Sequence, residues 1–248
     1  MQSLAGSTLP KLAETGCSYS ARIGTRMIVS DKLKIVYAAP PKTGSITIRH
    51  LMLKPPFHGY LSDRRFDHHN TYIMNGKRSY FHFMTVRHPY LRAHSFWRFM
   101  HAGSIDPKAK NDRRRSVWPR LFPPRLGYPS FSDWLHTGPR QKHRRSQFFT
   151  AMKNQWSCNW HKQKLGKLPV HIVHQERYDE ELRLVPGFEL FESFPVDNKQ
   201  EPAKKPWYEE FKEGDVKRIQ ELWPGDFSLF GYEKDFKKVK EGKYFVES

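Results

Sequence analysis

The chain has 248 residues, with 43 Lys and Arg against 25 Asp and Glu, and a formal net charge of +18. With 38% hydrophobic and 15% aromatic residues, it can bury a core of its own, which excludes a disordered basic tail. Two cysteines, Cys17 and Cys158, allow at most one disulfide and are too few for a disulfide-stapled scaffold or a four-cysteine zinc site.

The first half of the chain predicts two strand-to-helix units. Residues 1–32 are polar and predict a loosely packed N-terminal arm. A β-branched and aromatic run predicts a buried strand over 34–39, followed by a helix over 46–53. The pattern repeats with a strand over 80–86 and a helix from 90 to about 101.

The second half continues the alternation. A short helix is predicted over 131–136, a third buried strand over 170–174 with a helix over 176–184, and an amphipathic helix over 207–223. Strands that alternate with helices are typical of α/β proteins. We therefore expect a single α/β domain over 33–248, with a central parallel β-sheet flanked by helices.

The turn after the first predicted strand, Pro41–Thr47, has the parts of a phosphate-binding loop. Gly44 lets the backbone approach an anion, the start of the next helix adds a favourable dipole, and Lys42 supplies a full charge. It is not the nucleoside-triphosphate loop G-x-x-x-x-G-K-[ST], because Lys42 precedes Gly44 and no glycine lies upstream. Taken alone, an ordinary turn with a surface lysine explains it equally well.

A second motif follows the next predicted strand. Arg87 stands at the strand end, and Ser95 stands eight residues later, two turns into the following helix. Arg87 can bind an oxyanion bidentately, and Ser95 can donate a hydroxyl to the same group. Ligands of α/β sheets lie beyond the carboxyl ends of the strands, so the two motifs together predict a ligand with two separated anionic groups.

Together these motifs resemble those of sulfotransferases that use 3′-phosphoadenylyl sulfate, in particular the uronosyl, heparan 2-O-like branch of the carbohydrate sulfotransferases. Pro41–Thr47 is similar to the family's P-K-[TV]-x-[SC]-x-[ST] loop, which holds the 5′-phosphosulfate. Arg87–Ser95 is similar to its R-[DN]-P-[YF]-x-R-x-x-S segment, which holds the 3′-phosphate, except that His88 replaces the usual Asp or Asn. Pro129–Leu135 and Asp226–Tyr232 extend the resemblance.

The resemblance implies a P-loop-kinase-like sulfotransferase fold, 3′-phosphoadenylyl sulfate as donor, adenosine 3′,5′-bisphosphate as product, and no metal. It also implies roles for individual residues. Lys42 would stabilise the leaving phosphate. The cofactor-binding residues would be Lys42, Thr43, Gly44, Ser45, Ile46, Thr47, Arg87 and Ser95, with the loop residues contributing backbone amides and hydroxyls.

A general base and an acceptor-binding segment complete the implied site. His68 falls on the first histidine of the family's F-x-H-x-H segment, but Asn70 replaces the second, so His68 and His69 are both candidates for the base. A polar turn with two exposed histidines is the alternative. The segment with His143, Arg144 and Arg145 resembles a loop that closes over cofactor and acceptor, and it would meet an anionic acceptor.

Two basic clusters, over 108–120 and 140–145, favour an anionic partner unless they are simply solvated loops. The resemblance implies a hydroxyl-bearing acceptor, either a carbohydrate or another polar or anionic molecule. A kinase would need the triphosphate loop and a magnesium carboxylate, and a nucleic-acid-binding protein is supported by charge alone. No apolar run approaches the ~20 residues that span a bilayer. We expect a cytoplasmic protein, or a Golgi-lumenal one if an N-terminal anchor has been removed.

Overall fold

The computed structural model of the chain describes residues 27–38, 40, 42–61, 77, 79–105, 130–137, 155, 169–194 and 205–247, without the side chains of 99–105 and 137. Several sequence predictions lie outside these described residues. They concern His68, His69, the segment 143–145 and both basic clusters.

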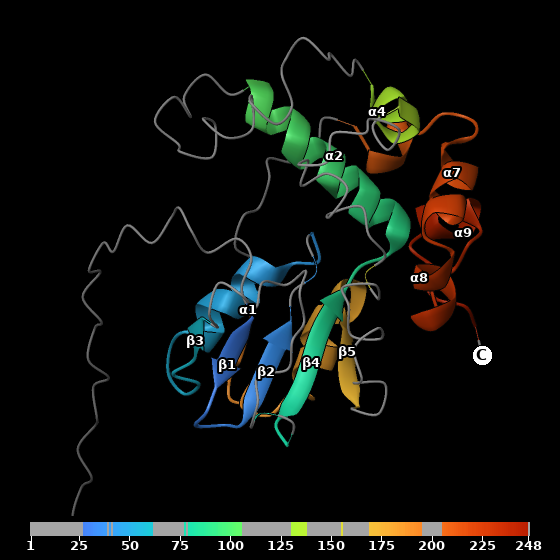
Figure 1. Cartoon of the computed structure of the whole chain (residues 1–248). Coiled ribbons are helices and arrows are strands. Elements are labelled where there is room, and N and C mark those ends of the chain that lie inside the picture. Colours follow the sequence, from blue (N-terminus) through green and yellow to red (C-terminus); the bar gives the residue numbers. More distant parts are fainter. Residues whose placement is uncertain are drawn as a thin grey trace, which may run out of the picture.

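The centre of the fold is a five-stranded sheet in the order β3-β1-β2-β4-β5 (Figure 1). Its strands are β1 (Ile28–Ser30), β2 (Ile35–Ala38), β3 (Tyr60–Leu61), β4 (Phe81–Val86) and β5 (Val170–His174). The expected parallel sheet is confirmed for the three strands β2, β4 and β5. The other two strands pair antiparallel, β1 with β2 and β3 with β1. The four-residue turn between β1 and β2 is too short for the crossover that a parallel pair needs.

Strand β1 lies inside the segment that the sequence predicted as an arm. Ile28, Val29 and Ser30 are all fully buried, and the Ser30 hydroxyl donates a hydrogen bond to the Phe57 carbonyl at 2.5 Å. The buried part of the chain therefore begins no later than Met27, and the expected boundary at residue 32 lies too far along the chain.

The helices form layers on the sheet. Figure 1 shows α1 beside β1 and β2, and α2 starting beyond the end of β4, beside the C-terminal helices, and running away from them. Within the described residues, α7 contacts α2, α4 and α8. The helical elements are α1 (Ser45–Met52), α2 (Pro89–Ile105), α4 (Phe131–Thr137), the 3₁₀ turn η4 (Gln175–Arg177), α6 (Tyr178–Leu182), the 3₁₀ turn η5 (Trp207–Glu210), α7 (Asp215–Leu222), α8 (Pro224–Leu229) and α9 (Phe236–Lys240).

The predicted amphipathic helix over 207–223 is divided in two. The 3₁₀ turn η5 ends at Glu210, and α7 begins only at Asp215. Gly214 before it adopts a left-handed conformation with φ 87°, which ends one element and allows the next to start. The Asp215 carboxylate accepts a hydrogen bond from the Lys212 amide at 2.7 Å, which stabilises this turn.

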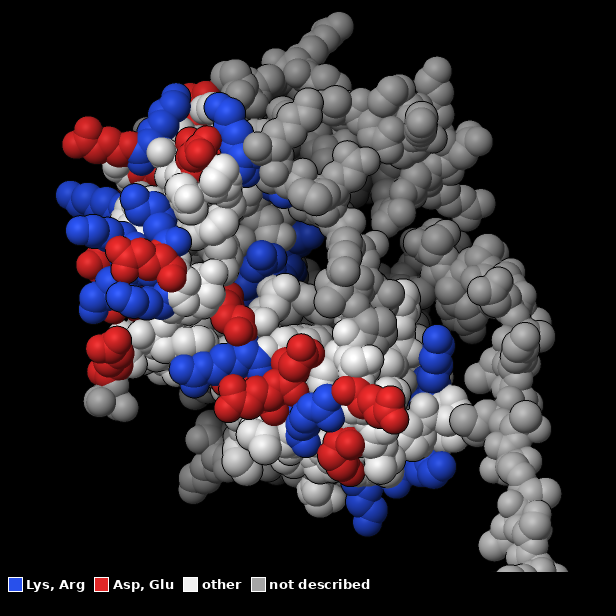
Figure 2. Space-filling model, turned by 180° about the vertical axis from the view of Figure 1, so that it is seen from behind, with Lys and Arg blue, Asp and Glu red and all other residues white. Residues whose placement is uncertain are grey.

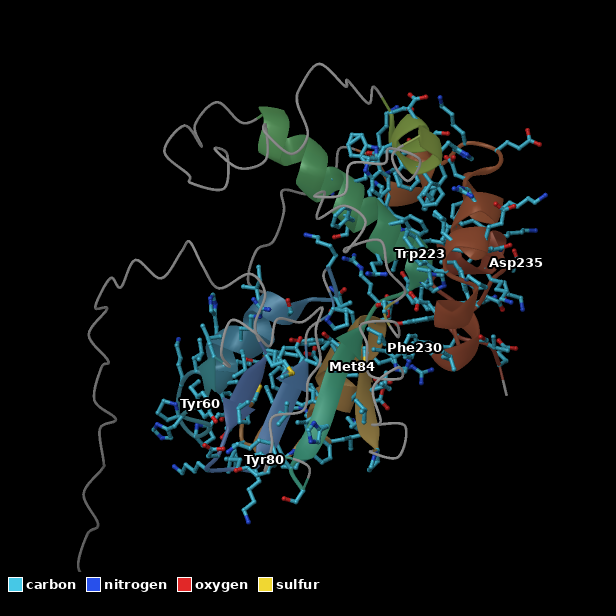
Figure 3. All side chains as sticks on the ribbon, in the orientation of Figure 1. Tyr60, Tyr80, Met84, Trp223, Phe230 and Asp235 are labelled. Carbon is cyan, nitrogen blue, oxygen red and sulfur yellow. The ribbon has the colours of Figure 1, made fainter. Side chains whose placement is uncertain are left out.

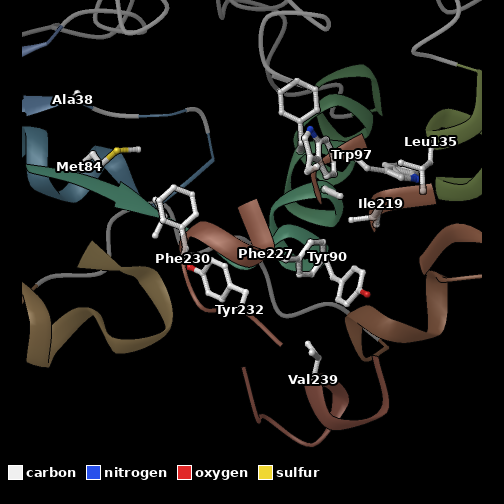
Figure 4. Close-up of a cluster of buried hydrophobic side chains, with 14 of the residues drawn as sticks. Ala38, Met84, Tyr90, Trp97, Leu135, Ile219, Phe227, Phe230, Tyr232 and Val239 are labelled. Atoms are coloured by element: carbon white, nitrogen blue, oxygen red, sulfur yellow. The ribbon is translucent and has the colours of Figure 1, made fainter. Parts of the chain in front are cut away.

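Two hydrophobic clusters cover the two faces of the sheet. Along β2, Ile35 and Tyr37 belong to one cluster, whereas Val36 and Ala38 belong to the other, as the two-residue period of a strand requires. Figure 3 shows Met84 on the sheet, with Trp223 and Phe230 in the C-terminal layer. In the close-up of this cluster, Tyr90, Phe227 and Tyr232 lie between α2 and the C-terminal elements (Figure 4).

The described part of the chain is almost balanced in charge. It holds 20 of the 43 Lys and Arg residues and 18 of the 25 Asp and Glu residues, a net charge of only +2. Figure 2 shows both signs interspersed on the described surface of one face. The large positive excess of the sequence therefore belongs to residues outside the described ranges.

Candidate active site

The two predicted anion-binding motifs meet at one edge of the sheet. β2 and β4 are parallel neighbours, with Ala38 opposite Met84, so the segments that follow them leave the sheet at the same end. Lys42 follows β2 and Arg87 follows β4. The charge of Arg87 contributes to lowering the pKa of Lys42, which places the two cations within electrostatic reach of each other.

The loop after β2 has the backbone geometry of an anion cradle. Lys42 and Gly44 both have positive φ values, of 68° and 81°. Gly44 also caps α1, and a Cβ on it would lie 3.4 Å from two atoms of the Gln175 side chain. The first turn of α1 contains no acidic residue, so no carboxylate there opposes an anion at the positive end of the helix.

Thr43 is anchored to the sheet by its side chain. Its hydroxyl donates to the Pro40 carbonyl at 2.8 Å and lies 2.8 Å from the Thr85 hydroxyl, which lies 2.8 Å from the Tyr37 hydroxyl. Because each hydroxyl has one proton, Thr85 donates to Thr43, and Tyr37 donates to Thr85. The expectation that the Thr43 hydroxyl contacts a ligand is therefore wrong. Only the backbone amide of Thr43 can donate to one.

The remaining loop residues differ in exposure. Ser45 is half-buried, Ile46 exposes 40% of its surface, and Thr47 is buried. Ser95 lies in α2 and is half-buried, two turns beyond Arg87, as its spacing predicted.

Burial perturbs both cations of the site. Desolvation, assisted by Arg87, lowers the pKa of Lys42 to about 8. Desolvation also lowers the pKa of Arg87, although the Glu176 carboxylate opposes this shift. Each residue as a whole retains an intermediate exposure. Removing two neighbouring cations from water is unfavourable, and a bound anion would offset this cost. These residues therefore fit a phosphate-bearing ligand.

Glu176 holds the backbone beside Arg87, and sequence reasoning did not assign it to the site. Its carboxylate accepts hydrogen bonds from the His88 amide at 2.8 Å and from the Tyr232 hydroxyl at 3.0 Å. Burial raises the pKa of Glu176. Its sequence signal is its position as the first residue of the helix predicted after the third strand.

His88 has a structural role at the position where the family motif carries Asp or Asn. Its Nδ1 accepts a hydrogen bond from the Tyr90 amide at 3.3 Å, and its Nε2 donates to the Glu233 carbonyl at 3.0 Å. Because α2 begins at Pro89, this contact caps the helix as an Asp or Asn oxygen would. Burial lowers the pKa of His88 to about 4, which keeps the ring neutral and consistent with this pattern.

The C-terminal residues fold back onto the same region. The Glu233 amide donates to the Tyr244 carbonyl at 2.9 Å, and the Val246 amide donates to the Gly231 carbonyl at 3.0 Å. Phe245 stacks on Tyr232 with ring centroids 5.5 Å apart. The Tyr244 ring lies 5.9 Å from the His88 ring, so the returning segment forms part of the wall around Arg87.

The described residues offer neither a metal-binding cluster nor a membrane-spanning helix. Within those ranges no group of three or more His, Cys, Asp or Glu could hold a metal ion. No helix in the same part of the chain is long and apolar enough to cross a membrane. The candidate base residues His68 and His69, and the acceptor-binding candidates His143, Arg144 and Arg145, lie outside this part.

Comparison with known proteins places the chain in a family. A family model described as "Sulfotransferase family" matches residues 25–233, which is more than half of the chain and includes both anion-binding motifs. Neither the curated proteins nor the solved structures contain a significant match. The matched region also includes all five strands of the sheet. The chain therefore belongs to the sulfotransferase family.

Proposed function

We propose that the protein transfers a sulfuryl group from 3′-phosphoadenylyl sulfate to a hydroxyl group of a carbohydrate or another polar or anionic acceptor. Family membership supports sulfuryl transfer in general. The observation that supports this particular donor is the pair of desolvated cations, Lys42 and Arg87, at the ends of adjacent parallel strands. Such a pair suits a nucleotide with one anionic group on each side of its ribose.

In this proposal each half of the site binds one anionic group. Lys42 and the backbone amides of residues 43–47 bind the 5′-phosphosulfate, and the N-terminal end of α1 adds its dipole. Arg87 and the Ser95 hydroxyl bind the 3′-phosphate. The Thr43 hydroxyl holds the loop against β4 through Thr85, which keeps the cradle in register with Arg87.

Different residues would act on the leaving group and on the acceptor in the chemical step. The bound donor supplies a sulfuryl group whose bond to the 5′-phosphate oxygen breaks as the acceptor oxygen attacks in line. Lys42 stabilises the negative charge that develops on that departing oxygen, and a pKa near 8 leaves it mostly protonated at neutral pH. His68 or His69 accepts the proton of the attacking hydroxyl.

The charge distribution supports an anionic acceptor. The described residues carry a net charge of only +2, so nearly all of the +18 resides in segments that include both basic clusters. Those clusters would attract an anionic molecule, with His143, Arg144 and Arg145 as its candidate contacts. A cytoplasmic location remains part of the proposal.

A binding titration tests the donor. The protein is titrated with adenosine 3′,5′-bisphosphate, with ATP and magnesium, and with duplex DNA at the same salt concentration. We expect the bisphosphate to bind most tightly, without added metal. Preference for ATP with magnesium would indicate a kinase, and preference for DNA would indicate a nucleic-acid-binding protein. Either result would contradict the proposal.

A further inference from the structure

The side chain of Gln155 pairs with the main chain of Arg87. Its Nε2 donates to the Arg87 carbonyl at 2.7 Å, and its Oε1 accepts from the Arg87 amide at 2.7 Å. Strand β4 ends at Val86, so Arg87 lies just beyond the regular ladder. The amide of Gln155 thus substitutes for a neighbouring strand at the residue where one is missing.

Gln155 is itself held from the opposite side. Its backbone amide donates to both carboxylate oxygens of Asp226, at 2.8 and 3.0 Å. Asp226 also forms an ion pair with Arg92 of α2, with the two atoms 3.6 Å apart. Gln155 and Asp226 are completely buried, and Arg92 exposes only 3% of its surface.

These contacts form a closed network, here called the circuit, that links Arg87, Arg92, Asp226 and Gln155. From Arg87 the chain runs through the first turn of α2 to Arg92, then across to Asp226, to Gln155 and back to Arg87. Both main-chain groups of Arg87 belong to the circuit, so the direction of its Cα–Cβ bond is set by buried partners. Arg87 as a whole residue, in contrast, retains intermediate exposure.

We propose that Gln155 is a positioning residue, which sets nucleotide affinity by fixing the Arg87 main chain without touching the ligand. This inference rests on the proposed function, in which Arg87 binds the 3′-phosphate. A bidentate Arg–phosphate contact depends on the placement of the guanidinium, and losing one partner of such a charged pair costs about 2 kcal/mol or more, so releasing the Arg87 main chain will weaken that contact. The alternative is that Gln155 only satisfies buried polar groups and contributes to stability alone.

Two ligands separate these roles. Adenosine 3′,5′-bisphosphate carries the 3′-phosphate, and adenosine 5′-phosphate lacks it. Gln155→Leu removes both hydrogen bonds to Arg87. It should lower the affinity for adenosine 3′,5′-bisphosphate by about 10- to 100-fold, while changing the affinity for adenosine 5′-phosphate by less than about 2-fold. Ser30→Ala is the control, because Ser30 is also fully buried and also donates to a backbone carbonyl, that of Phe57 at 2.5 Å, but lies in β1.

Two further variants separate a loss of Arg87 positioning from unfolding and from a wrong assignment of the 3′-phosphate site. Gln155→Asn retains an amide that is one methylene too short to reach both groups; it should fold and lose part of the bisphosphate affinity. With Arg87→Ala already present, Gln155→Leu should cause no further loss. Equal losses for both ligands, or fully additive effects of the two substitutions, would overturn the inference alone. If Arg87→Ala leaves bisphosphate affinity unchanged, the proposed 3′-phosphate site fails, and the inference fails with it.

Discussion

The low pKa of Lys42 makes nucleotide affinity depend on pH. Burial and the neighbouring Arg87 lower this pKa from 10.5 to about 8. A phosphate beside the ammonium favours its charged form, so binding raises the pKa again. If the bound phosphate restores the ordinary value, the change of about 2.5 units corresponds to roughly 3 kcal/mol, or about 300-fold in affinity.

Proton linkage determines the direction in which nucleotide affinity changes with pH. The complex holds the Lys42 proton more tightly than the free protein does, so binding takes up protons. The affinity for the nucleotide is at its maximum below pH 8, where Lys42 of the free protein is protonated. It decreases about tenfold per pH unit as the pH rises from 8 towards 10.5. The uptake on binding should be about half a proton at pH 8 and about 0.9 proton at pH 9.

Isothermal titration calorimetry with adenosine 3′,5′-bisphosphate measures both quantities. Titrations between pH 7 and 9.5, each in two buffers with different ionisation enthalpies, give the affinity and the proton uptake. Lys42→Arg is the control, because arginine stays charged over this range and its affinity should stay flat. Unchanged affinity from pH 7 to 9.5 in the unaltered protein, without proton uptake at pH 9, would refute the placement of Lys42 beside the phosphate.

Three further predictions concern the base, the buried histidine and the acceptor. Either His68→Ala or His69→Ala should lower single-turnover transfer by about 10²- to 10⁴-fold with bisphosphate affinity intact; if both variants keep the full rate, the base lies elsewhere, with His143 the next candidate. Because His88 has a pKa of about 4 in the fold, the part of the unfolding free energy that depends on its neutral ring should be complete above pH 6.5. About 3 kcal/mol of it should be lost as the pH falls towards 4, and urea unfolding at pH 7 and pH 4.5 should show a smaller acid loss in His88→Asn. Turnover with an anionic acceptor should decrease between about 0.05 and 0.3 M salt, and salt-independent turnover would assign the basic clusters to solvated loops.

The elements that carry the anion-binding motifs could be predicted because their signals are local. The strand over 170–174 agrees with β5 at both ends, and Pro89 marks the first residue of α2. Parallel neighbours must leave a sheet at the same edge, so the approach of Lys42 to Arg87 also followed from order along the chain.

The residues that surround Arg87 could not be predicted in this way. Gln155 and Glu176 reach its segment across 68 and 88 positions of the chain, and no periodic pattern encodes such contacts. The inward orientation of Thr43 depends on Thr85, which becomes its neighbour only when β2 and β4 pair. Strand β1 escaped prediction because three residues are too few to show a period.

The return of the C-terminal residues means that the family match and the folding unit end at different places. The match stops at residue 233, but Tyr244 and Phe245 beyond it shelter Tyr232 and the surroundings of Arg87. A chain shortened to the matched region would admit water to this corner and raise its dielectric constant. The guanidinium would then hold a phosphate less strongly, although every residue of both anion-binding motifs would remain.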